Sequence, residues 1–577
     1  MPTREEVDAM LTGPGGMFEV VTEEVEGVRI KVYKERMSSL RDVFVMGTAR
    51  GDDQEYIVYG DRRMGFGTFA RQANGVAAAL AERHGIGRGD GPHGERVAVL
   101  SANNPEWVLT FWATVNLGGI LVGLNGWWKA DEIIYGLEDS GAKVLVADKG
   151  RFDRIAGMLG TLSGLEAIYL VDADPADYDD PRVRRFDELV SESDTAPDEP
   201  IAEDDYAVIF YTSGTTGRPK GAVSSHRSMI ANLQNTMFNA VAGAMAGGGA
   251  VLQDSGGGQT ASLLTSPMFH VSGCHSGIVV GLLAGLKLVI PVGKFEPKKA
   301  LRLIQDEKVN VFATVPTMIW RIVEFPDRHD YDTSSVTSVA YGGSPSAGEL
   351  QRRVQETFPN VGVGLGNAYG LTESSSVATL IAGQDFIDRP DSVGRPLPVV
   401  EVRVVDGKGE DVPVGETGEV WIRGPIIMPG YWGKPEATAE TITPDRWLRS
   451  GDIGRLDDEG FLYITDRAKD MIIRGGENIY CVEIENRLVE HPAIADAAVI
   501  GVPHPTLGEE VKAVVQVEPG RSVTAADVRA WVAETLANFK VPEYVEIQDD
   551  KLPRNASGKL LKNVLRGEGV VSFEETM

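Results

Sequence analysis

The segment YTSGTTGRPKGAV, residues 211–223, has the composition of a loop that binds an anion. A strand that ends in a turn rich in glycine and hydroxyl groups directs backbone N–H groups and hydroxyls at a common point. The donors and flexible positions are Ser213, Gly214, Thr215, Thr216, Gly217, Lys220 and Gly221. Gly217 and Lys220 do not have the spacing of a Walker A motif. The residues alone therefore predict a phosphate-binding loop of unknown class.

Three other polar residues lie in contexts that allow a structural as well as a chemical interpretation. Asp452 follows a glycine, and an aspartate in such a place usually forms a turn. Lys559 lies in the segment PRNASGK, where a solvated surface lysine is the ordinary expectation. His270 in MFHVSG is a single histidine, and single histidines are more often core residues than gates or ligands. From the residues alone, all three roles stay open.

The elements that would position these residues follow a β-α-β rhythm over most of the chain. Residues 96–102 predict a buried strand, and the helix that follows begins at Pro105 and ends at glycines. Further strands are predicted at 142–148, 167–172 and 206–212, and the last of these runs into the anion-binding loop. This alternation is typical of parallel sheets that are covered by helices.

The pattern changes toward the C-terminus. The glycine-dense residues 242–258 predict a mobile surface loop. Near Arg403, alternating strands and turn signals predict a small antiparallel or barrel-like subdomain. After DRAKD, residues 466–470, helices and strands alternate over about a hundred residues, an ordinary domain size. We therefore expect an α/β protein with a large N-terminal domain of parallel sheets layered with helices, a small barrel-like subdomain, and a small mobile α+β C-terminal domain.

Charge and cysteine content narrow the functional classes. The 577 residues carry a formal net charge of −28, and an acidic surface repels phosphate backbones, so nucleic acid is not an expected partner. The two cysteines, Cys274 and Cys481, exclude a disulfide framework and suit a reducing cytoplasm. The start lacks the order of a signal peptide, and the apolar residues 278–292 include Lys287 and predict a buried helix followed by a strand. We expect a cytoplasmic protein; peripheral contact with a membrane is left open.

The loop YTSGTTGRPKG resembles the signature loop of the adenylate-forming superfamily, which comprises acyl-CoA synthetases, luciferases and nonribosomal adenylation domains. Further motifs of that superfamily follow in the same order. They are MFHVSG (268–273), YGGSP (341–345), NAYGLTES (367–374), LRSGD (448–452), DRAKDMIIRGGENIY (466–480) and PRNASGK (553–559). Because seven ordered motifs do not agree by chance, the chain is identified as a member of this superfamily, in the acyl-CoA synthetase or fatty-acid–CoA ligase branch.

The resemblance implies a reaction in two halves. A carboxylate attacks the α-phosphate of ATP to give acyl-AMP and pyrophosphate, and the thiol of coenzyme A then displaces AMP.

In the family, the loop cradles the β- and γ-phosphates and Thr372 donates to the α-phosphate. Tyr369 stacks on adenine, and Asp452 accepts the ribose hydroxyls with help from Arg467. Glu373 is the implied ligand of Mg²⁺, which prefers hard oxygen ligands. The implied catalytic residues are Lys559, Thr372 and Glu373, and the implied ATP-binding residues are Thr212, Ser213, Gly214, Thr215, Thr216, Gly217, Lys220, Gly343, Ser344, Asn367, Tyr369, Gly370, Thr372, Asp452, Arg467 and Lys559.

The same resemblance implies movement. The lysine that matches Lys559 crosses the gap between domains and bridges the carboxylate and the α-phosphate, which suits a compact charge on a long stem. It must then leave so that the thiol can enter, and a hinge supplies this movement. The hinge position matches Lys469. We expect an adenylation domain that binds ATP and the acid at 1–466, a hinge at 467–469 and a mobile lid domain at 470–577. The implied coenzyme A tunnel consists of Arg474, Gly475 and Gly476.

The acyl pocket implied by the resemblance has small, apolar walls. It comprises His270, as a gate, with Val271, Gly342, Gly343 and Gly366. No charge is present that could pair with an ammonium group, so a hydrophobic acid is favoured over an amino acid. A medium- or long-chain fatty acid is the first expectation, and an aryl or steroid-derived carboxylate is the second.

Two alternatives to a CoA ligase stay open. One is an acyl-AMP ligase that loads a carrier protein, which the uninterrupted segment DRAKDMIIRGG disfavours. The other is a nucleotide-binding scaffold protein, which intact Lys559, Glu373 and Asp452 disfavour. A luciferase-like second half is disfavoured because Ile473 stands where some relatives carry a second lysine. The expected partners are the small-molecule acid, ATP and CoA, and assembly as a homodimer is left open.

Overall fold

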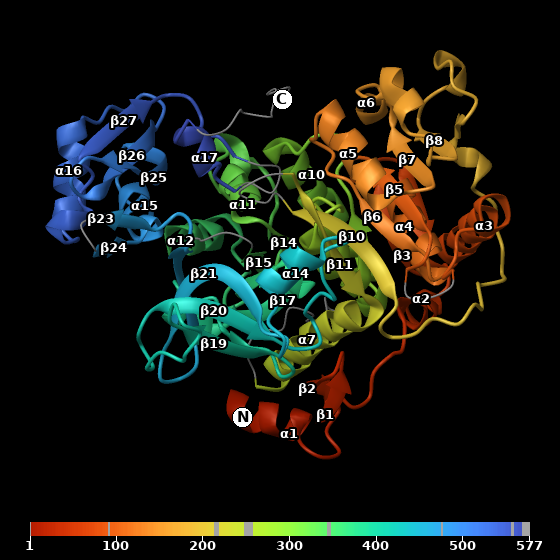
Figure 1. Cartoon of the computed structure of the whole chain (residues 1–577), viewed down its shortest axis with the longest axis horizontal. Coiled ribbons are helices and arrows are strands. Elements are labelled where there is room, and N and C mark those ends of the chain that lie inside the picture. The colour runs from red at the N-terminus through yellow and green to blue at the C-terminus, as the bar shows by residue number, and fades with distance from the viewer. Residues whose placement is uncertain are drawn as a thin grey trace.

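The computed structural model of the chain describes residues 2–89, 93–212, 218–246, 258–342, 348–474, 477–554 and 559–567. Within them, five β-sheets are present, and two of these are large and layered with helices. Figure 1 shows a large body that carries both of these sheets, and a smaller C-terminal body, coloured blue, beside it.

The first large sheet has seven strands in the order β11-β10-β6-β5-β7-β8-β9. All neighbours are parallel except β10 and β11, which form an antiparallel hairpin. Val97 and Val99 pack into one apolar cluster, and Ala98 and Leu100 pack into another on the opposite face. Because both faces are buried, the strand sequence is apolar throughout. The strands are β5 (Arg96–Leu100), β6 (Ile120–Gly123), β7 (Val144–Asp148), β8 (Ala167–Val171), β9 (Val183–Arg185), β10 (Tyr206–Thr212) and β11 (Lys220–Ser225).

The second large sheet has nine strands in the order β18-β17-β16-β15-β14-β12-β13-β3-β4. Its central strands are parallel, whereas β4 at one edge and β17 and β18 at the other are antiparallel to their neighbours. The strands are β3 (Glu55–Tyr59), β4 (Arg62–Gly65), β12 (Ala261–Leu263), β13 (Lys287–Val289), β14 (Val311–Thr314), β15 (Ser338–Gly342), β16 (Leu365–Leu371), β17 (Ser376–Ala382) and β18 (Arg395–Pro396).

Helices cover both sheets and fill the space between them. One apolar cluster joins α2, α3 and α4 to both sheets, a second joins α5 to the outer face of the seven-stranded sheet, and a third joins α10, α11 and α12 to the nine-stranded sheet. Helix α4 begins with Asn104 as its N-cap and Pro105 as its first residue, and all its residues are buried. The helices of this body are α1 (Arg4–Thr12), α2 (Leu40–Thr48), α3 (Phe66–His84), α4 (Pro105–Asn116), α5 (Ala130–Ser140), α6 (Lys149–Phe152), α7 (His226–Met245), α8 (Val271–Gly273), α9 (Val280–Ala284), α10 (Pro297–Glu307), α11 (Pro316–Val323), α12 (Gly348–Thr357), α13 (Gln384–Asp388) and α14 (Pro435–Thr441).

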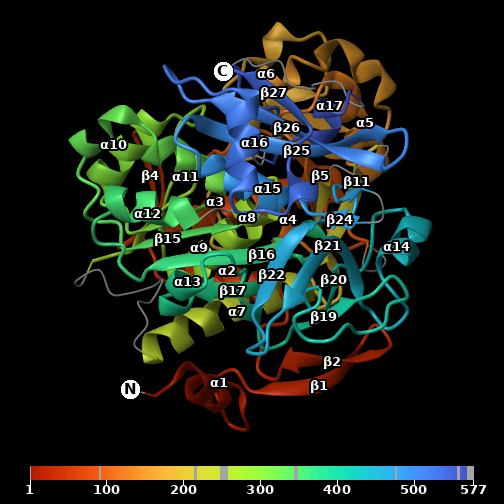
Figure 2. The same ribbon diagram turned by 90° about the vertical axis from the view of Figure 1, so that its left-hand side faces the viewer.

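Two small antiparallel sheets flank this body. The hairpin of β1 and β2 lies with α1 at the bottom of the molecule in Figure 2, where Phe18 packs against Phe238 of α7. The predicted antiparallel subdomain is confirmed as the four-stranded sheet β19-β20-β21-β22. The strands are β1 (Val20–Val25), β2 (Val28–Tyr33), β19 (Glu401–Val405), β20 (Gly418–Arg423), β21 (Leu448–Leu456) and β22 (Leu462–Arg467).

The C-terminal body is built on a five-stranded sheet that packs against two helices around its own apolar cluster. The change of sheet falls between Arg467, at the end of β22, and Ile472, at the start of β23. The elements are β23 (Ile472–Arg474), β24 (Glu477–Ile479), α15 (Cys481–Val489), β25 (Ile494–His504), β26 (Gly508–Val517), α16 (Ala525–Ala533), β27 (Tyr544–Gln548) and α17 (Lys562–Leu565).

The predicted fold class is confirmed, with two differences in detail. The seven-stranded sheet ends in an antiparallel strand at β11, and the nine-stranded sheet ends in antiparallel strands at both edges, whereas the other edge strand of the first sheet, β9, is parallel to β8. The expected loop at 242–258 is wrong in its first residues, since α7 continues to Met245; residues 247–257 lie outside the described part of the chain. Among the described residues, none of the helices combines the length and apolar character needed to cross a membrane.

A cleft of about 510 Å³ separates α11 and α12 from the C-terminal sheet. Glu324, Arg353 and Glu518 all line it. Partial burial and then the charges of Glu518 and Asp496 raise the pKa of Glu324 from 4.5 to about 7, while Arg353 and Lys551 act to lower it. The carboxyl group of Glu324 therefore gains a proton near neutral pH when the two bodies are in contact.

We predict that Glu324→Gln makes the protein more stable at pH 8 but not at pH 5. The pKa of Glu324 in the folded state exceeds its ordinary value of 4.5. The stability that the Glu324 side chain contributes to the fold is therefore fully present below pH 4.5 and is lost as the pH rises through about 7. Glutamine resembles the protonated form at every pH. Thermal unfolding of both proteins from pH 5 to pH 8 measures the difference, and a difference that does not change with pH would contradict the assignment.

Candidate functional site

The anion-binding loop is held at the end of the β10–β11 hairpin. Thr212 and Lys220 form the last pair of the antiparallel ladder, and the Thr212 hydroxyl lies 3.4 Å from the Lys220 carbonyl oxygen. The Lys220 ammonium lies 5.1 Å from the centre of the Tyr431 ring. Residues 213–217, which include the predicted donors Ser213, Gly214, Thr215, Thr216 and Gly217, lie outside the described residues. The hairpin therefore brings both ends of the predicted loop together.

A buried carboxylate fixes the base of this hairpin. Asp139 accepts hydrogen bonds from the Tyr211 hydroxyl at 3.0 Å and from the Tyr135 hydroxyl at 3.2 Å. Lys434 adds an ion pair at 2.6 Å, and the Asp139 side chain is 8% exposed. Tyr135 also donates to the carbonyl of Pro219. Because a buried charge requires partners, these contacts tie α5 and the segment near Lys434 to the loop.

Asp452 is a second buried carboxylate, and it lies opposite Arg467 in the β21–β22 ladder. Arg467 Nε lies 2.8 Å from Oδ1 of Asp452, and the Tyr369 hydroxyl donates to Oδ2 at 2.7 Å. A carboxylate oxygen can accept more than one hydrogen bond. Each oxygen thus has one protein donor and retains capacity for a ligand hydroxyl, which fits the predicted ribose contact.

Glycine is required where β16 ends and the chain reverses. A bulge separates Tyr369 from Gly370 in the β16–β17 ladder, and a Cβ at Gly370 would lie 1.6 Å from the Ser376 carbonyl oxygen. The one-turn helix of Thr372–Ser374 follows, and the next residue has a φ of 49°. This tight reversal places Thr372 and Glu373 at the end of a parallel strand, where ligands of such sheets bind.

Glu373 is oriented by the segment that ends at Tyr431. The Tyr431 hydroxyl donates to Oε1 of Glu373 at 2.8 Å, and the Met428 N–H donates to the Glu373 carbonyl at 2.9 Å. Within the described residues there is no group of three or more His, Cys, Asp or Glu side chains that could hold a metal ion. A magnesium ion at Glu373 would therefore take most of its oxygen ligands from phosphates and water, as Mg²⁺ commonly does.

Lys559 belongs to the C-terminal body, but its ammonium group interacts with residues of the large body. Burial and then the charges of Arg467 and Lys469 lower the pKa of Lys559 to about 8, against the opposing effect of Asp452 and Glu373. Burial and the Lys559 charge also lower the pKa of His270 to about 4. The three predicted catalytic or ribose-binding residues Lys559, Glu373 and Asp452 thus share one electrostatic environment.

The predicted acyl-pocket residues lie on three neighbouring elements. His270 is the N-cap residue of α8, which starts at Val271. Gly342 ends β15, where it pairs with Ala368, and Gly366 pairs with Ala340 in the same ladder. The structure therefore brings the strands that carry Gly342 and Gly366 side by side. Gly343 and Ser344 lie outside the described residues.

Among the remaining predicted residues, Asn367 and Arg474 have structural partners of their own. Asn367 is buried in β16, and its amide donates to the Ser392 carbonyl at 3.3 Å. Arg474 ends β23, where its Nε lies 2.6 Å from Oε1 of Glu510. Lys469 lies in the turn between β22 and β23. Gly475 and Gly476 lie outside the described residues. The proposed roles of Asn367 in ATP binding, Lys469 as the hinge and Arg474 in the tunnel stay predictions.

Sequence reasoning missed Asp139 and Tyr431. Neither lies in one of the seven motifs, and their spacing from the loop and from Glu373 along the chain gives no signal. An aromatic pair in the segment YWGKPE, residues 431–436, is compatible with an ordinary turn. Only the packing of this segment against η6 (Thr372–Ser374) and β11 brings the Tyr431 hydroxyl to Glu373.

Comparison with protein families agrees with this arrangement. A family model described as "AMP-binding enzyme" matches residues 44–432, and one described as "AMP-binding enzyme C-terminal domain" matches residues 483–559. The chain belongs to the AMP-binding enzyme family. The predicted membership of the adenylate-forming superfamily is thereby confirmed, and the enzyme is an AMP-forming acid–thiol ligase, as its relatives are CoA synthetases and ligases.

The AMP-binding enzyme is similar to relatives that differ in their named acids. It is 35% identical over 498 residues to a feruloyl-CoA synthase of Amycolatopsis. The aligned region covers 86% of this chain and 91% of that protein. It is 36% identical over 521 residues to a 3-[(3aS,4S,7aS)-7a-methyl-1,5-dioxo-octahydro-1H-inden-4-yl]propanoyl:CoA ligase of Rhodococcus jostii, with 88% and 94% covered. The crystal structure of ATP-bound MatB from Rhodopseudomonas palustris superposes with a TM-score of 0.77 at 29% identity, over 92% of this chain and 99% of that one.

We predict that Tyr369→Phe raises the KM for ATP about tenfold or more, because the loss of one hydrogen bond to a charged group is worth roughly 1.5–3 kcal/mol. The variant keeps the ring, so the predicted stacking on adenine would be retained while the donor to Asp452 is lost. Initial-rate kinetics at varied ATP measure the effect. Tyr369→Leu is the control that removes the ring as well, and an equal KM for both variants would show that only the hydroxyl matters.

Proposed function

We propose that this AMP-forming enzyme activates a hydrophobic carboxylic acid as acyl-AMP at the site around Asp452, Glu373 and Lys559, and then transfers the acyl group to coenzyme A. The observation that carries the proposal is the electrostatic coupling of Lys559, from the C-terminal body, to Asp452 and Glu373 of the large body. The coupling supports a common role for three residues that come from three separate motifs.

The first half-reaction joins an anionic carboxylate to the α-phosphate of ATP. In our proposal Asp452, held by Tyr369 and Arg467, binds the ribose and fixes the α-phosphate beside Thr372. The ammonium of Lys559 contacts both reacting anions, reduces their repulsion and stabilises the charge that accumulates as pyrophosphate leaves. No general base is needed, because the nucleophile is already a carboxylate.

Magnesium fits the site through Glu373. Its carboxylate is a hard oxygen ligand, and the Tyr431 hydroxyl fixes Oε1 and leaves the other oxygen without a protein donor among the described residues. The ion would supply charge neutralisation for the phosphate oxygens. Orientation of Glu373 is the contribution of this chain.

For the second half-reaction, Lys559 must withdraw so that the thiol can reach the acyl carbon. Lys469, in the turn between β22 and β23, is the proposed hinge, with the lid from residue 470 onward. A rotation there would move Arg474 and its strand β23 toward the large body. The thiolate then forms the thioester bond, and the acyl–phosphate bond breaks with AMP as the leaving group.

The acid is hydrophobic in this proposal, and a medium- or long-chain fatty acid was the first expectation. A specific observation favours an oxygen-bearing ring acid as a second candidate. His275 lies in a π-helix, Cys274–Val279, directly after α8, and its Nε2 is 3.1 Å from the Ser224 hydroxyl. Burial lowers its pKa to about 3, and its Nδ1 has no hydrogen-bond partner among the described residues. A buried polar atom without a partner is unfavourable, and a keto or hydroxyl group of a ring acid would satisfy it.

A test of the function measures pyrophosphate release and thioester formation with decanoate, ferulate and a bicyclic propanoate, each with and without CoA. We expect pyrophosphate release and thioester formation with at least one acid. In the control variant Lys559→Ala, the rate of the first half-reaction should fall by a factor of about 10² to 10³. Release without thioester would point to a ligase that loads a carrier protein. Absence of release with every acid would point to a nucleotide-binding scaffold protein.

We predict that kcat/KM for ATP falls as the pH rises through about 8, the pKa of Lys559. The protonated ammonium is the form that attracts phosphate, so activity is present below this pH and is lost above it. Bound ATP favours the charged form, so kcat should fall only at higher pH. In Lys559→Arg, whose side chain does not titrate in this range, the fall near pH 8 should disappear; its persistence would assign the titration to another group.

A further inference from the structure

The β1–β2 hairpin ends in a turn whose first residue has an unfavourable backbone conformation. Val25 pairs with Val28, so the turn consists of Glu26 and Gly27, with φ values of 49° and 80°. These values belong to a type I′ turn, in which glycine, asparagine and aspartate are preferred. A glutamate at the first position is disfavoured, which suggests that its side chain has a role.

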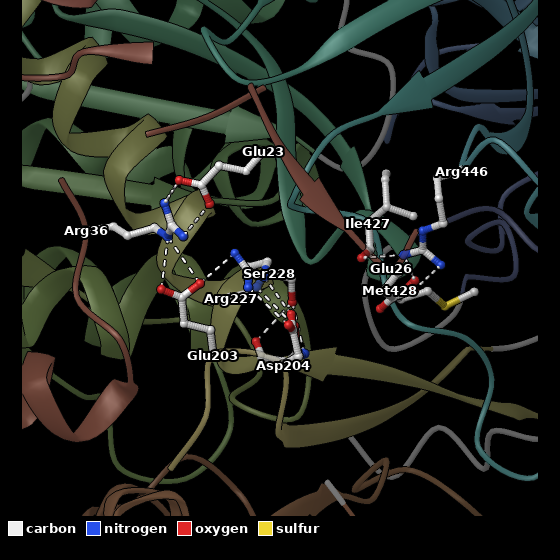
Figure 3. Close-up of polar contacts among 11 residues, drawn as sticks. Glu23, Glu26, Arg36, Glu203, Asp204, Arg227, Ser228, Ile427, Met428 and Arg446 are labelled. Atoms are coloured by element: carbon white, nitrogen blue, oxygen red, sulfur yellow. Dashed lines mark hydrogen bonds and ion pairs between the residues drawn. The ribbon is translucent and has the colours of Figure 1, made fainter. Parts of the chain in front are cut away.

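The Glu26 side chain forms an ion pair with Arg446, whose backbone is equally unusual. Nη1 of Arg446 lies 2.8 Å from Oε2 of Glu26, and the Arg446 side chain is 16% exposed. The φ of Arg446 is 68°, in the left-handed region that favours glycine. Two residues that are not glycine and have positive φ therefore face each other across one ion pair, which Figure 3 shows.

The guanidinium of Arg446 also holds a stretch of main chain. Its Nη2 donates to the carbonyl of Met428 at 2.9 Å and to that of Ile427 at 3.4 Å. Its Nη1 lies 3.5 Å from the carbonyl of Pro429. A planar cation with several donors suits this task, because it satisfies buried carbonyl groups that have no strand partner.

This stretch of main chain is the one that orients Glu373. The Met428 N–H donates to the Glu373 carbonyl at 2.9 Å, and three residues later the Tyr431 hydroxyl donates to Oε1 of Glu373 at 2.8 Å. A single residue, Met428, thus accepts from Arg446 through its carbonyl and donates to the Glu373 carbonyl through its N–H. The contacts therefore run from Glu26 through Arg446 and Met428 to the main chain of Glu373, and Tyr431, three residues after Met428, holds the Glu373 carboxylate.

The other end of the hairpin is anchored independently. Arg36 directly follows the hairpin, and its side chain lies 2.8 Å from Oε2 of Glu23 and 3.0 Å from Oε1 of Glu203. Arg227 of α7 adds a contact to Glu203 at 2.6 Å. These pairs lie on the left of Figure 3, and the Arg446 cluster lies on the right. With its base fixed to α7, the hairpin holds Glu26 at a defined position.

We propose that the β1–β2 hairpin uses Glu26 to hold Arg446 as a positioning residue, which sets Glu373 and thereby the affinity of the site for the magnesium-bound phosphates of ATP. The family model of the adenylation domain starts at residue 44, so this hairpin lies outside the matched segment. The inference rests on the proposed function, because it takes Glu373 as the magnesium ligand.

The test uses Glu26→Gly and Arg446→Gly in the full chain, because glycine removes each side chain while it suits the positive φ. Calorimetry measures the Kd of a non-hydrolysable ATP analogue with Mg²⁺, and the Kd of AMP, which lacks the β- and γ-phosphates. We expect each variant to weaken the magnesium–nucleotide complex about fivefold, the scale of coupling through neighbouring contacts. The Kd of AMP should stay as in the wild type, and the double variant should lose no more affinity for the magnesium–nucleotide complex than Arg446→Gly alone.

Lys31→Ala is the matched control, because Lys31 joins the same hairpin to Glu401 at 3.9 Å without contact to Arg446.

Three outcomes would overturn the inference alone, and a fourth would also overturn the proposed function. Equal weakening of AMP and of the magnesium–nucleotide complex would mean a general structural role, as would an effect of Lys31→Ala as large as that of Glu26→Gly. Unchanged binding in both glycine variants would remove the link to Glu373. A wild-type protein that binds neither nucleotide would instead refute the proposed function itself, and the inference would fall with it.

Discussion

A carboxylate and a triphosphate repel each other, and the rest of the structure depends on how this repulsion is overcome. In the proposed function, Lys559 supplies the needed charge from the C-terminal body, and burial together with Arg467 and Lys469 lowers its pKa to about 8. Its proton is therefore held only loosely until phosphate arrives. If the bodies part as proposed, the ammonium group leaves the site with the C-terminal body, and one site could then serve two successive reactions.

The carboxylates of the site are held by neutral phenols. Tyr369 donates to Asp452, and Tyr431 donates to Glu373. A hydroxyl fixes the orientation of a carboxylate without cancelling its charge, so that charge remains for a ribose or a metal ion. Of these two carboxylates, Asp452 is the more deeply buried, and it also forms an ion pair with Arg467. The different partners suit different ligands: uncharged hydroxyl groups at one carboxylate and a divalent cation at the other.

Motif residues could be predicted from sequence, whereas the residues that orient them could not. The loop after β10 and the β-α-β order follow from local composition, and both large sheets formed as expected. The pairing of Asp452 with Arg467 depends on the register of β21 and β22, which no local pattern specifies. Tyr431 acts through tertiary contacts from a segment without a motif. The end of α7 was misjudged because its last residues, AGAM, combine glycine with good helix formers, and packing of α7 decided the outcome.

The cleft between α11, α12 and the C-terminal sheet has a consequence for the balance between the two halves of the reaction. Charges of both signs line it, with Glu324 and Arg353 on one side and Glu518 on the other. If the lid rotates as proposed, these groups separate and become hydrated. Dissolved ions screen exposed charges far more than enclosed ones. In that case, the ionic strength of the surroundings would act on the resting position of the lid, at a distance from any reacting atom.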